Sequence, residues 1–92
     1  MPSLFSIGGY RIFFWSNEMH EPIHVHVCKG KPSSKATKIW LTSKGKCVLA
    51  NNNSRIEKTE LNELLGVISA HFFLICDEWK KHFLVDDINF YC

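Results

Sequence analysis

One apolar stripe in the last third of the chain constrains the fold more than any other feature of the sequence. Between Thr59 and Phe83, apolar residues recur at spacings of three and four positions, which is the pattern of one face of an α-helix. Thr59 is the predicted N-cap, and Glu60 and Glu63 fall in the first turn, where negative charge is favoured. The spacing therefore predicts a single long helix over residues 59–83. The stripe consists of Leu61, Leu64, Leu65, Ile68, Phe72, Ile75, Cys76, Trp79 and Phe83.

The length of this helix sets the next expectation. A helix over residues 59–83 would be about 37 Å long at about 1.5 Å per residue, whereas a six-residue strand covers about 20 Å. Val67, His71 and Leu74 lie off the main stripe and widen the apolar surface. Either the helix bends, or the surplus surface meets another subunit. We favour the second, which predicts a homodimer or a complex with a small protein partner.

The residues before the helix have the pattern of short β-strands. Residues 23–28 alternate with period two, and the aromatic and β-branched run 10–15 is typical of a strand. Short, turn-rich connections favour antiparallel neighbours. The predicted fold is α+β, an antiparallel three- to four-stranded meander packed on one long C-terminal helix. The expected elements are strands over 10–15, 23–28, 37–42 and 47–50, turns at 8–9 and 16–18, and a further edge strand over 88–92.

Length and composition are those of one small globular domain. The chain has 92 residues, and domains run from roughly 50 to 250 residues, so residues 1–92 are expected to form a single domain. A hydrophobic fraction of 46%, with 13% aromatic residues, excludes a disordered tail. The N-terminus lacks the pattern of a secretory signal, and the longest apolar run, residues 70–76, is far shorter than the roughly 20 residues of a membrane span. We therefore expect a cytoplasmic protein that makes no membrane contact, with its four cysteines as free thiols.

Charge is distributed unevenly along the chain. The net charge is only +2, but residues 1–50 hold seven basic and two acidic side chains, whereas residues 51–92 hold four basic and seven acidic ones. A positive half of this kind can attract polyanions. The same asymmetry would also let two copies associate head to tail.

His24 and His26 form an H-x-H pair on the predicted strand 23–28. Alternation places both imidazoles and Cys28 on one face of the strand, and its β-branched residues on the other. Two imidazoles and a thiol are ligands that zinc accepts, but a zinc site needs further ligands, and the strand has no carboxylate to orient either ring. We therefore assign no metal and no cofactor. The alternative interpretation is a pair of half-exposed histidines on a solvated face.

The same histidines suggest acid–base chemistry. Histidine titrates near neutral pH, so one imidazole could take the 2′-hydroxyl proton of RNA while the other protonates the leaving oxygen. A nearby cation would stabilise the charge on the phosphorane. This hypothesis describes a His-dependent ribonuclease. Its candidate catalytic residues are His24, His26, Arg11 and Glu21.

A lysine-rich stretch follows the H-x-H pair. Residues 28–46 contain six lysines and no acidic residue, with Trp40 among them. Basic side chains beside an exposed aromatic ring are what a phosphate backbone and a stacked base require. The alternative is an ordinary solvated hairpin whose lysines protect a sheet edge from aggregation. The candidate nucleic-acid-binding residues are Lys29, Lys31, Lys35, Lys38 and Trp40.

Phe13, Trp15 and Trp40 are expected on the sheet face that points away from the helix. A single helix covers only one face of a sheet, so an aromatic patch on the other face would mark an interface. A different strand register would return some of these rings to the core.

Three segments together resemble a known family. Residues 9–18, 21–27 and 61–65 are similar to the small bacterial domain family of unknown function numbered 4160, and the E-P-x-H-V-H-V core at 21–27 is the most specific element. His20 and Ile23 depart from the residues usual in that family. The resemblance implies no established activity, and gene context associates its members with toxin–antitoxin-like or regulatory roles. The matching positions are Arg11, Glu21, His24 and His26.

Three functional hypotheses result. The leading one is a small nucleic-acid-associated module, regulatory or toxin–antitoxin-like, with RNA and DNA both open as ligands. The second is a protein–protein interaction or dimerisation module without catalysis. The third is a His-dependent ribonuclease or metal-binding protein.

Overall fold

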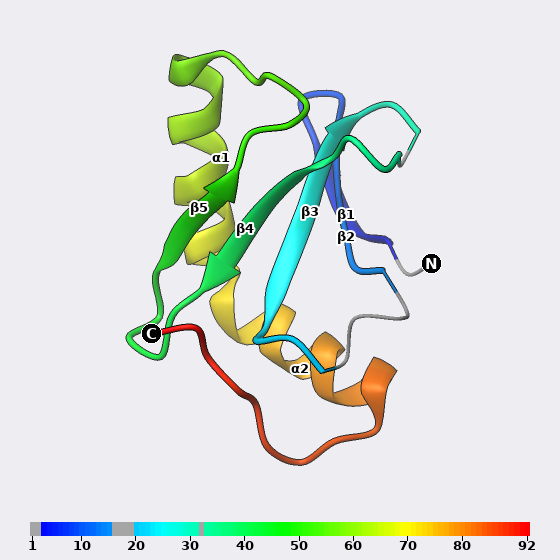
Figure 1. The fold of residues 1–92 in the computed structure, drawn as a ribbon, viewed down its shortest axis with the longest axis vertical. Coiled ribbons are helices and arrows are strands. Elements are labelled where there is room, and N and C mark those ends of the chain that lie inside the picture. The colour runs from blue at the N-terminus through cyan, green and yellow to red at the C-terminus, as the bar shows by residue number, and fades with distance from the viewer. Residues whose placement is uncertain (1–2, 16–19, 32) are drawn as a thin grey trace.

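A five-stranded antiparallel sheet and two C-terminal helices make up the described part of the chain, residues 3–15, 20–31 and 33–92, in a computed structural model (Figure 1). The strands lie in the sheet in chain order, as a meander. The predicted α+β class is confirmed. The elements are β1 Ser3–Ile7, β2 Tyr10–Phe13, β3 His24–Lys29, β4 Thr37–Leu41, β5 Cys47–Asn51, α1 Lys58–Ala70 and α2 Phe72–Phe83.

The sheet has one strand, β1, that the sequence analysis did not predict. Its sequence, SLFSI, gives little alternation, and its register against β2 shifts between Ser3 and Phe5. A turn at Gly8 and Gly9 joins the two strands, with φ of 55° and 83°. Positive φ at both central residues is the geometry of the tight hairpin turn that glycine accommodates best. The glycine pair thus turns the chain back on itself and adds a strand. The predicted turn over 16–18 lies outside the described residues.

The predicted long helix is wrong in one respect, because it bends. α1 and α2 meet at His71 at an angle of 70°. α1 runs along the side of the sheet near β5, and α2 turns across the end of the sheet where β3 begins (Figure 1). This turn carries Trp79 and Phe83 onto Phe14, with the Phe14 and Trp79 ring centroids 5.0 Å apart. Bending therefore buries the end of the apolar stripe, Trp79 and Phe83, within the chain, whereas Leu74 stays 45% exposed. The expected homodimer or small protein partner stays a prediction.

The first helix also begins slightly earlier than predicted. Glu57, not Thr59, is the N-cap, and its side chain makes no capping hydrogen bond. Glu60 remains in the first turn, as expected from the helix dipole.

The hydrophobic core lies between the sheet and the two helices. Inward-facing side chains of β2, β3 and β4 meet the apolar stripe of α1 and α2, so the predicted stripe is the buried face of both helices. A second, smaller cluster of Phe13, Cys28 and Ala36 lies apart from it, with Trp15 packed against it. The main core contains Ile12, Phe14, Ile23, Val25, Val27, Ile39, Leu41, Ile56, Leu61, Leu64, Ile68, Ile75, Cys76, Trp79 and Phe83.

The C-terminal tail returns to the sheet without forming the predicted edge strand. The Ile23 N–H donates to the Asn89 carbonyl at 2.8 Å, and the Ser43 N–H donates to the Cys92 carbonyl at 2.9 Å. Between these two points the tail follows the end of the sheet (Figure 1). Two backbone hydrogen bonds and two aromatic stacks, Phe90 on Phe72 and Tyr91 on Trp40, hold it there.

Within the described ranges, no single helix is both long and apolar enough to cross a membrane. α1 and α2 taken together have sufficient length and hydropathy, but the 70° bend separates them.

Candidate functional site

The two histidines of β3 lie together, on the sheet face opposite the main core. Val25 and Val27 point into the core, whereas His24 and His26 point away from it, so the predicted alternation is confirmed. Their ring centroids are 5.0 Å apart. The predicted solvent exposure is wrong, because the exposed fraction is 0% for His24 and 6% for His26.

Aromatic rings from three other elements bury these histidines. The Phe13 ring stacks on His26 at 5.6 Å between centroids. Trp40 and Trp79 approach His24 edge-on at 5.4 and 5.5 Å. Phe13 and Trp40 lie opposite the two histidines in the strand register, whereas Trp79 comes from α2. The imidazoles are therefore components of an aromatic cluster that excludes solvent.

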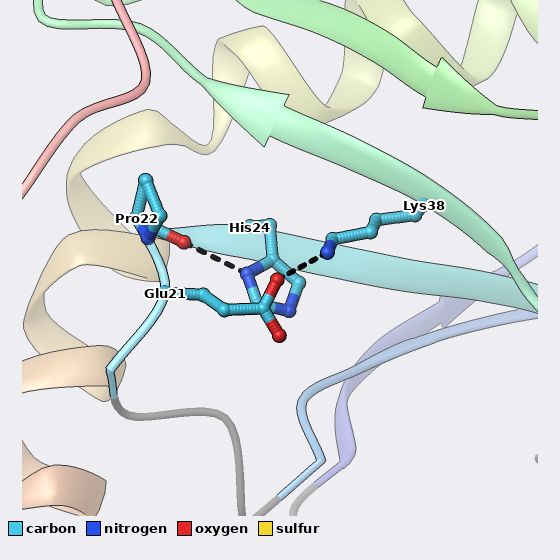
Figure 2. Close-up of polar contacts among 4 residues, drawn as sticks. All are labelled: Glu21, Pro22, His24 and Lys38. Atoms are coloured by element: carbon cyan, nitrogen blue, oxygen red, sulfur yellow. Dashed lines mark hydrogen bonds and ion pairs between the residues drawn. The ribbon is translucent and has the colours of Figure 1, made fainter.

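The segment before β3 adds two polar contacts to this cluster. The His24 Nδ1–H donates to the Pro22 carbonyl at 2.8 Å, which fixes the proton on Nδ1 because a carbonyl can only accept (Figure 2). The Glu21 carboxylate forms an ion pair with the Lys38 ammonium, which reaches across from β4 (Figure 2). Glu21 is thus tied to Lys38, which lies opposite His26 in the β3–β4 register.

Arg11 lies on the same sheet face as the histidines, further along the strands. In the β2–β3 register, Arg11 lies opposite Cys28, beyond the pair formed by Phe13 and His26. His24 is four residues from Cys28 along β3, about 13 Å at the rise of a strand. The structure brings His24 and His26 together and pairs Glu21 with Lys38. Both rings are buried, so contact with RNA would require the covering side chains to move.

No group of three or more metal-ligating side chains converges in the part of the chain that the structure describes. Cys28 lies beside the histidines in sequence, but its thiol donates to the Lys31 carbonyl at 3.2 Å. All four cysteines are described, and all are free thiols.

The candidate nucleic-acid-binding residues separate into two groups. Lys38 and Trp40 belong to the aromatic face, where the Lys38 ammonium lies 4.3 Å from the Trp40 ring centroid. The Tyr91 ring stacks on Trp40 at 4.9 Å between centroids, with the planes within 2°. Trp40 is therefore covered by the tail, and Lys38 is already paired with Glu21.

The remaining lysines, Lys29, Lys31 and Lys35, are exposed at the opposite end of the sheet, in and beside the β3–β4 loop. Two of them, Lys29 and Lys35, line a hollow of about 300 Å³ together with Arg55 from the β5–α1 loop. Among the described residues, no Asp or Glu lines this hollow. We call Lys29, Lys35, Arg55 and their hollow the basic hollow. Its full lining consists of Tyr10, Cys28, Lys29, Ser33, Lys35, Ser54, Arg55 and Ile56.

A buried hydrogen-bond network holds the β5–α1 loop against β4. The Asn52 side-chain carbonyl accepts from the Thr37 hydroxyl at 2.9 Å and from the Ile56 N–H at 3.0 Å, while the Asn52 amide donates to the Ile56 carbonyl at 2.9 Å. Because the Thr37 hydroxyl donates its hydrogen to Asn52, the Ser54 hydroxyl must be the donor in the contact between Ser54 and Thr37, at 2.5 Å. Thr37 is fully buried. This network fixes the position of Arg55, whose N–H donates to the Asn52 carbonyl at 3.0 Å.

The family model described as "Domain of unknown function (DUF4160)" matches residues 9–80. The chain belongs to the DUF4160 family. The DUF4160 match covers β2 to β5, α1 and most of α2, and therefore contains both the aromatic cluster around the histidines and the basic hollow. No curated protein and no solved structure matches the sequence.

Arg55 is the residue of the basic hollow that the sequence analysis did not single out. It follows the run Asn51-Asn52-Asn53-Ser54, which marks a loop but gives no sign of what that loop approaches. Only the meander order, with β3, β4 and β5 side by side, brings the β3–β4 and β5–α1 loops to the same end of the sheet. Arg55 has φ of 56°, a left-handed conformation that is uncommon outside glycine and asparagine.

Tyr10 forms the wall of the basic hollow toward α1. Its hydroxyl donates to the Glu60 carboxylate. The pKa of Tyr10 is raised above its ordinary value, first because that hydrogen bond favours the protonated phenol, and then through partial burial and the negative charges of Glu60 and Glu57. The Lys29 ammonium lies 5.6 Å from the Tyr10 ring centroid. Tyr10 therefore links the hollow to the first turn of α1 as a neutral side chain at physiological pH.

Proposed function

We propose that this DUF4160 chain binds nucleic acid through the basic end of its sheet, by Lys29, Lys31, Lys35 and Arg55. The observation that supports this is the convergence of Lys29, Lys35 and Arg55, from three separate segments, on one hollow that no described acidic side chain lines. Such binding suits a small regulatory or toxin–antitoxin-like protein.

Two facts favour the basic end over the aromatic face. Lys38 on the aromatic face is neutralised by Glu21, and Trp40 is covered by Tyr91. The lysines of the β3–β4 loop are exposed. Phosphate binding therefore requires no rearrangement at the basic end, whereas base stacking on Trp40 would require the tail to move.

The physical basis is release of counterions from the phosphate backbone. Each phosphate of a single strand that these cations neutralise adds about −0.7 to the slope of the logarithm of the association constant against the logarithm of salt concentration. Affinity should therefore fall steeply between roughly 50 and 200 mM salt.

Fluorescence anisotropy with labelled RNA and DNA strands tests the proposal. Lys35→Ala and Arg55→Ala should each weaken binding about tenfold, since each removes one charged contact. Lys44→Ala is the matched control, because Lys44 is equally exposed but lies in the β4–β5 turn at the other end of the sheet. Absence of binding at low salt, or equal losses in all three variants, would contradict the proposal.

A further inference from the structure

The basic hollow has more charge at one point than an internal phosphate of a nucleic acid can neutralise. Lys29, Lys35 and Arg55 all line the same small volume, whereas the phosphates of an extended strand carry one negative charge each and are spread along it. A terminal phosphate monoester carries a charge of about −1.5 to −2 at neutral pH. We infer that the basic hollow holds the phosphorylated end of a nucleic-acid strand, an inference that rests on the proposed function.

The dimensions of the hollow agree with an end rather than a passing strand. Its volume of about 300 Å³ is at the lower limit of small-ligand sites, roughly 300–1,000 Å³. That volume accommodates a phosphate and its adjoining sugar. Four segments line it, namely the start of β2, the end of β3, the β3–β4 loop and the β5–α1 loop. A terminal group needs one exit from such a hollow, whereas an internal phosphate needs two.

The donors around the hollow are arranged for oxygen acceptors. Arg55 offers a planar fork of N–H groups suited to two phosphate oxygens. The Ser33 hydroxyl oxygen already accepts from the Lys35 N–H at 3.2 Å, which directs its hydrogen toward another acceptor. The Ser54 hydroxyl donates its hydrogen to Thr37, so Ser54 positions the loop and has no hydrogen left to donate to the ligand.

The backbone of Arg55 supports a fixed ligand contact. A non-glycine residue with φ of 56° is held there at an energetic penalty, and such conformations occur often at ligand sites. The network of Asn52, Thr37 and Ser54 imposes that conformation from the buried side. The backbone that carries Arg55 is thereby held beside the hollow before any ligand arrives.

Three strands of identical sequence test the inference by competition anisotropy at one ionic strength: one with a 5′-phosphate, one with a 3′-phosphate and one with hydroxyl groups at both ends. We expect at least one phosphorylated strand to bind about tenfold more tightly than the unphosphorylated strand. The strand that binds more tightly shows whether the hollow takes a 5′-phosphate or a 3′-phosphate. Arg55→Lys should keep general affinity but reduce this preference, because lysine retains the charge and loses the fork. Lys44→Ala should keep the preference.

The outcomes distinguish failure of the end-binding inference from failure of the proposed function. Equal affinity for all three strands, with binding that is still sensitive to Lys35→Ala, would overturn the end-binding inference and leave the proposed function standing. No binding of any strand at low salt would overturn both. Circular dichroism of each variant excludes loss of fold as the cause of a lost preference.

Discussion

The phenol ring of Tyr91 lies flat on the indole of Trp40, with 4.9 Å between centroids and 2° between planes. This contact joins the C-terminal tail to β4 near the end of that strand, and the Ser43–Cys92 hydrogen bond joins the tail to the β4–β5 turn. The family match ends at residue 80, so the tail lies outside it. The tail thus adds cover to the aromatic face from outside the matched region.

Tyr91→Ala should therefore destabilise the fold and expose Trp40. A stacked aromatic pair contributes about 0.5–1.5 kcal/mol beyond the area that it buries. Urea denaturation should show a loss of at least about 1 kcal/mol, and Tyr91→Phe should retain nearly all of the stability. An unchanged midpoint for Tyr91→Ala would mean that the stack contributes nothing in solution.

The network around Asn52 gives a second prediction. Asn52→Ala removes the partners of the Ile56 N–H and carbonyl and of the buried Thr37 hydroxyl. Leaving buried polar groups unsatisfied costs about 1–3 kcal/mol, so the free energy of unfolding should fall by that amount. Asn53→Ala, one residue further along and exposed, is the matched control. Because Arg55 lies on the same loop, Asn52→Ala should also reduce nucleic-acid affinity, whereas Asn53→Ala should not.

The local sequence pattern was sufficient to predict most of the strands and the buried face of the helices. The alternation of β3 assigned His24 and His26 to the correct face because a strand has a fixed period of two. The alternation could not predict that both histidines are buried, because the rings that cover His24 include Trp79, which is more than fifty residues away in the sequence. Arg55 escaped detection for the same reason, as its neighbours in space come from another loop.

The helix bend shows the limit of periodicity most clearly. The apolar stripe continues through His71 without proline or glycine at the break, so nothing local indicates a change of direction. The bend follows from packing, because only a turned α2 places Trp79 and Phe83 on Phe14. A straight helix would leave those rings beyond the sheet. Helix direction was therefore decided by long-range contacts and not by the sequence of the segment itself.

Leu84 offers a third prediction, of increased stability. It ends α2 in the left-handed conformation, with φ of 55°, and 90% of its surface is exposed. Glycine has no Cβ penalty there, and leucine buries almost nothing that would be lost. Leu84→Gly should raise the free energy of unfolding by about 1 kcal/mol. Leu84→Ala is the control, since alanine shortens the side chain but keeps the Cβ; if it stabilised the protein as much as glycine, backbone strain would not be the cause.

Tyr10 and Glu60 predict how stability depends on pH at the alkaline end. The pKa of Tyr10 is raised in the folded state above its ordinary value of 10.0, chiefly by the hydrogen bond to Glu60. Above that ordinary value, the unfolded chain loses the phenol proton while the folded chain keeps it, so the folded state binds more protons. The stabilisation is fully present below the unfolded pKa and is lost as pH rises through the folded pKa.

The chain has only two tyrosines, so Tyr91→Phe leaves the tyrosinate absorbance as a report on Tyr10 alone. In that background the absorbance midpoint should lie above 10.0, and Glu60→Gln should lower it, because the amide accepts a hydrogen bond without the negative charge. Glu63→Gln, which keeps the Tyr10–Glu60 bond, should move the midpoint much less. Should Glu60→Gln and Glu63→Gln shift the midpoint equally, the general charge of α1 and not the hydrogen bond would set the pKa of Tyr10.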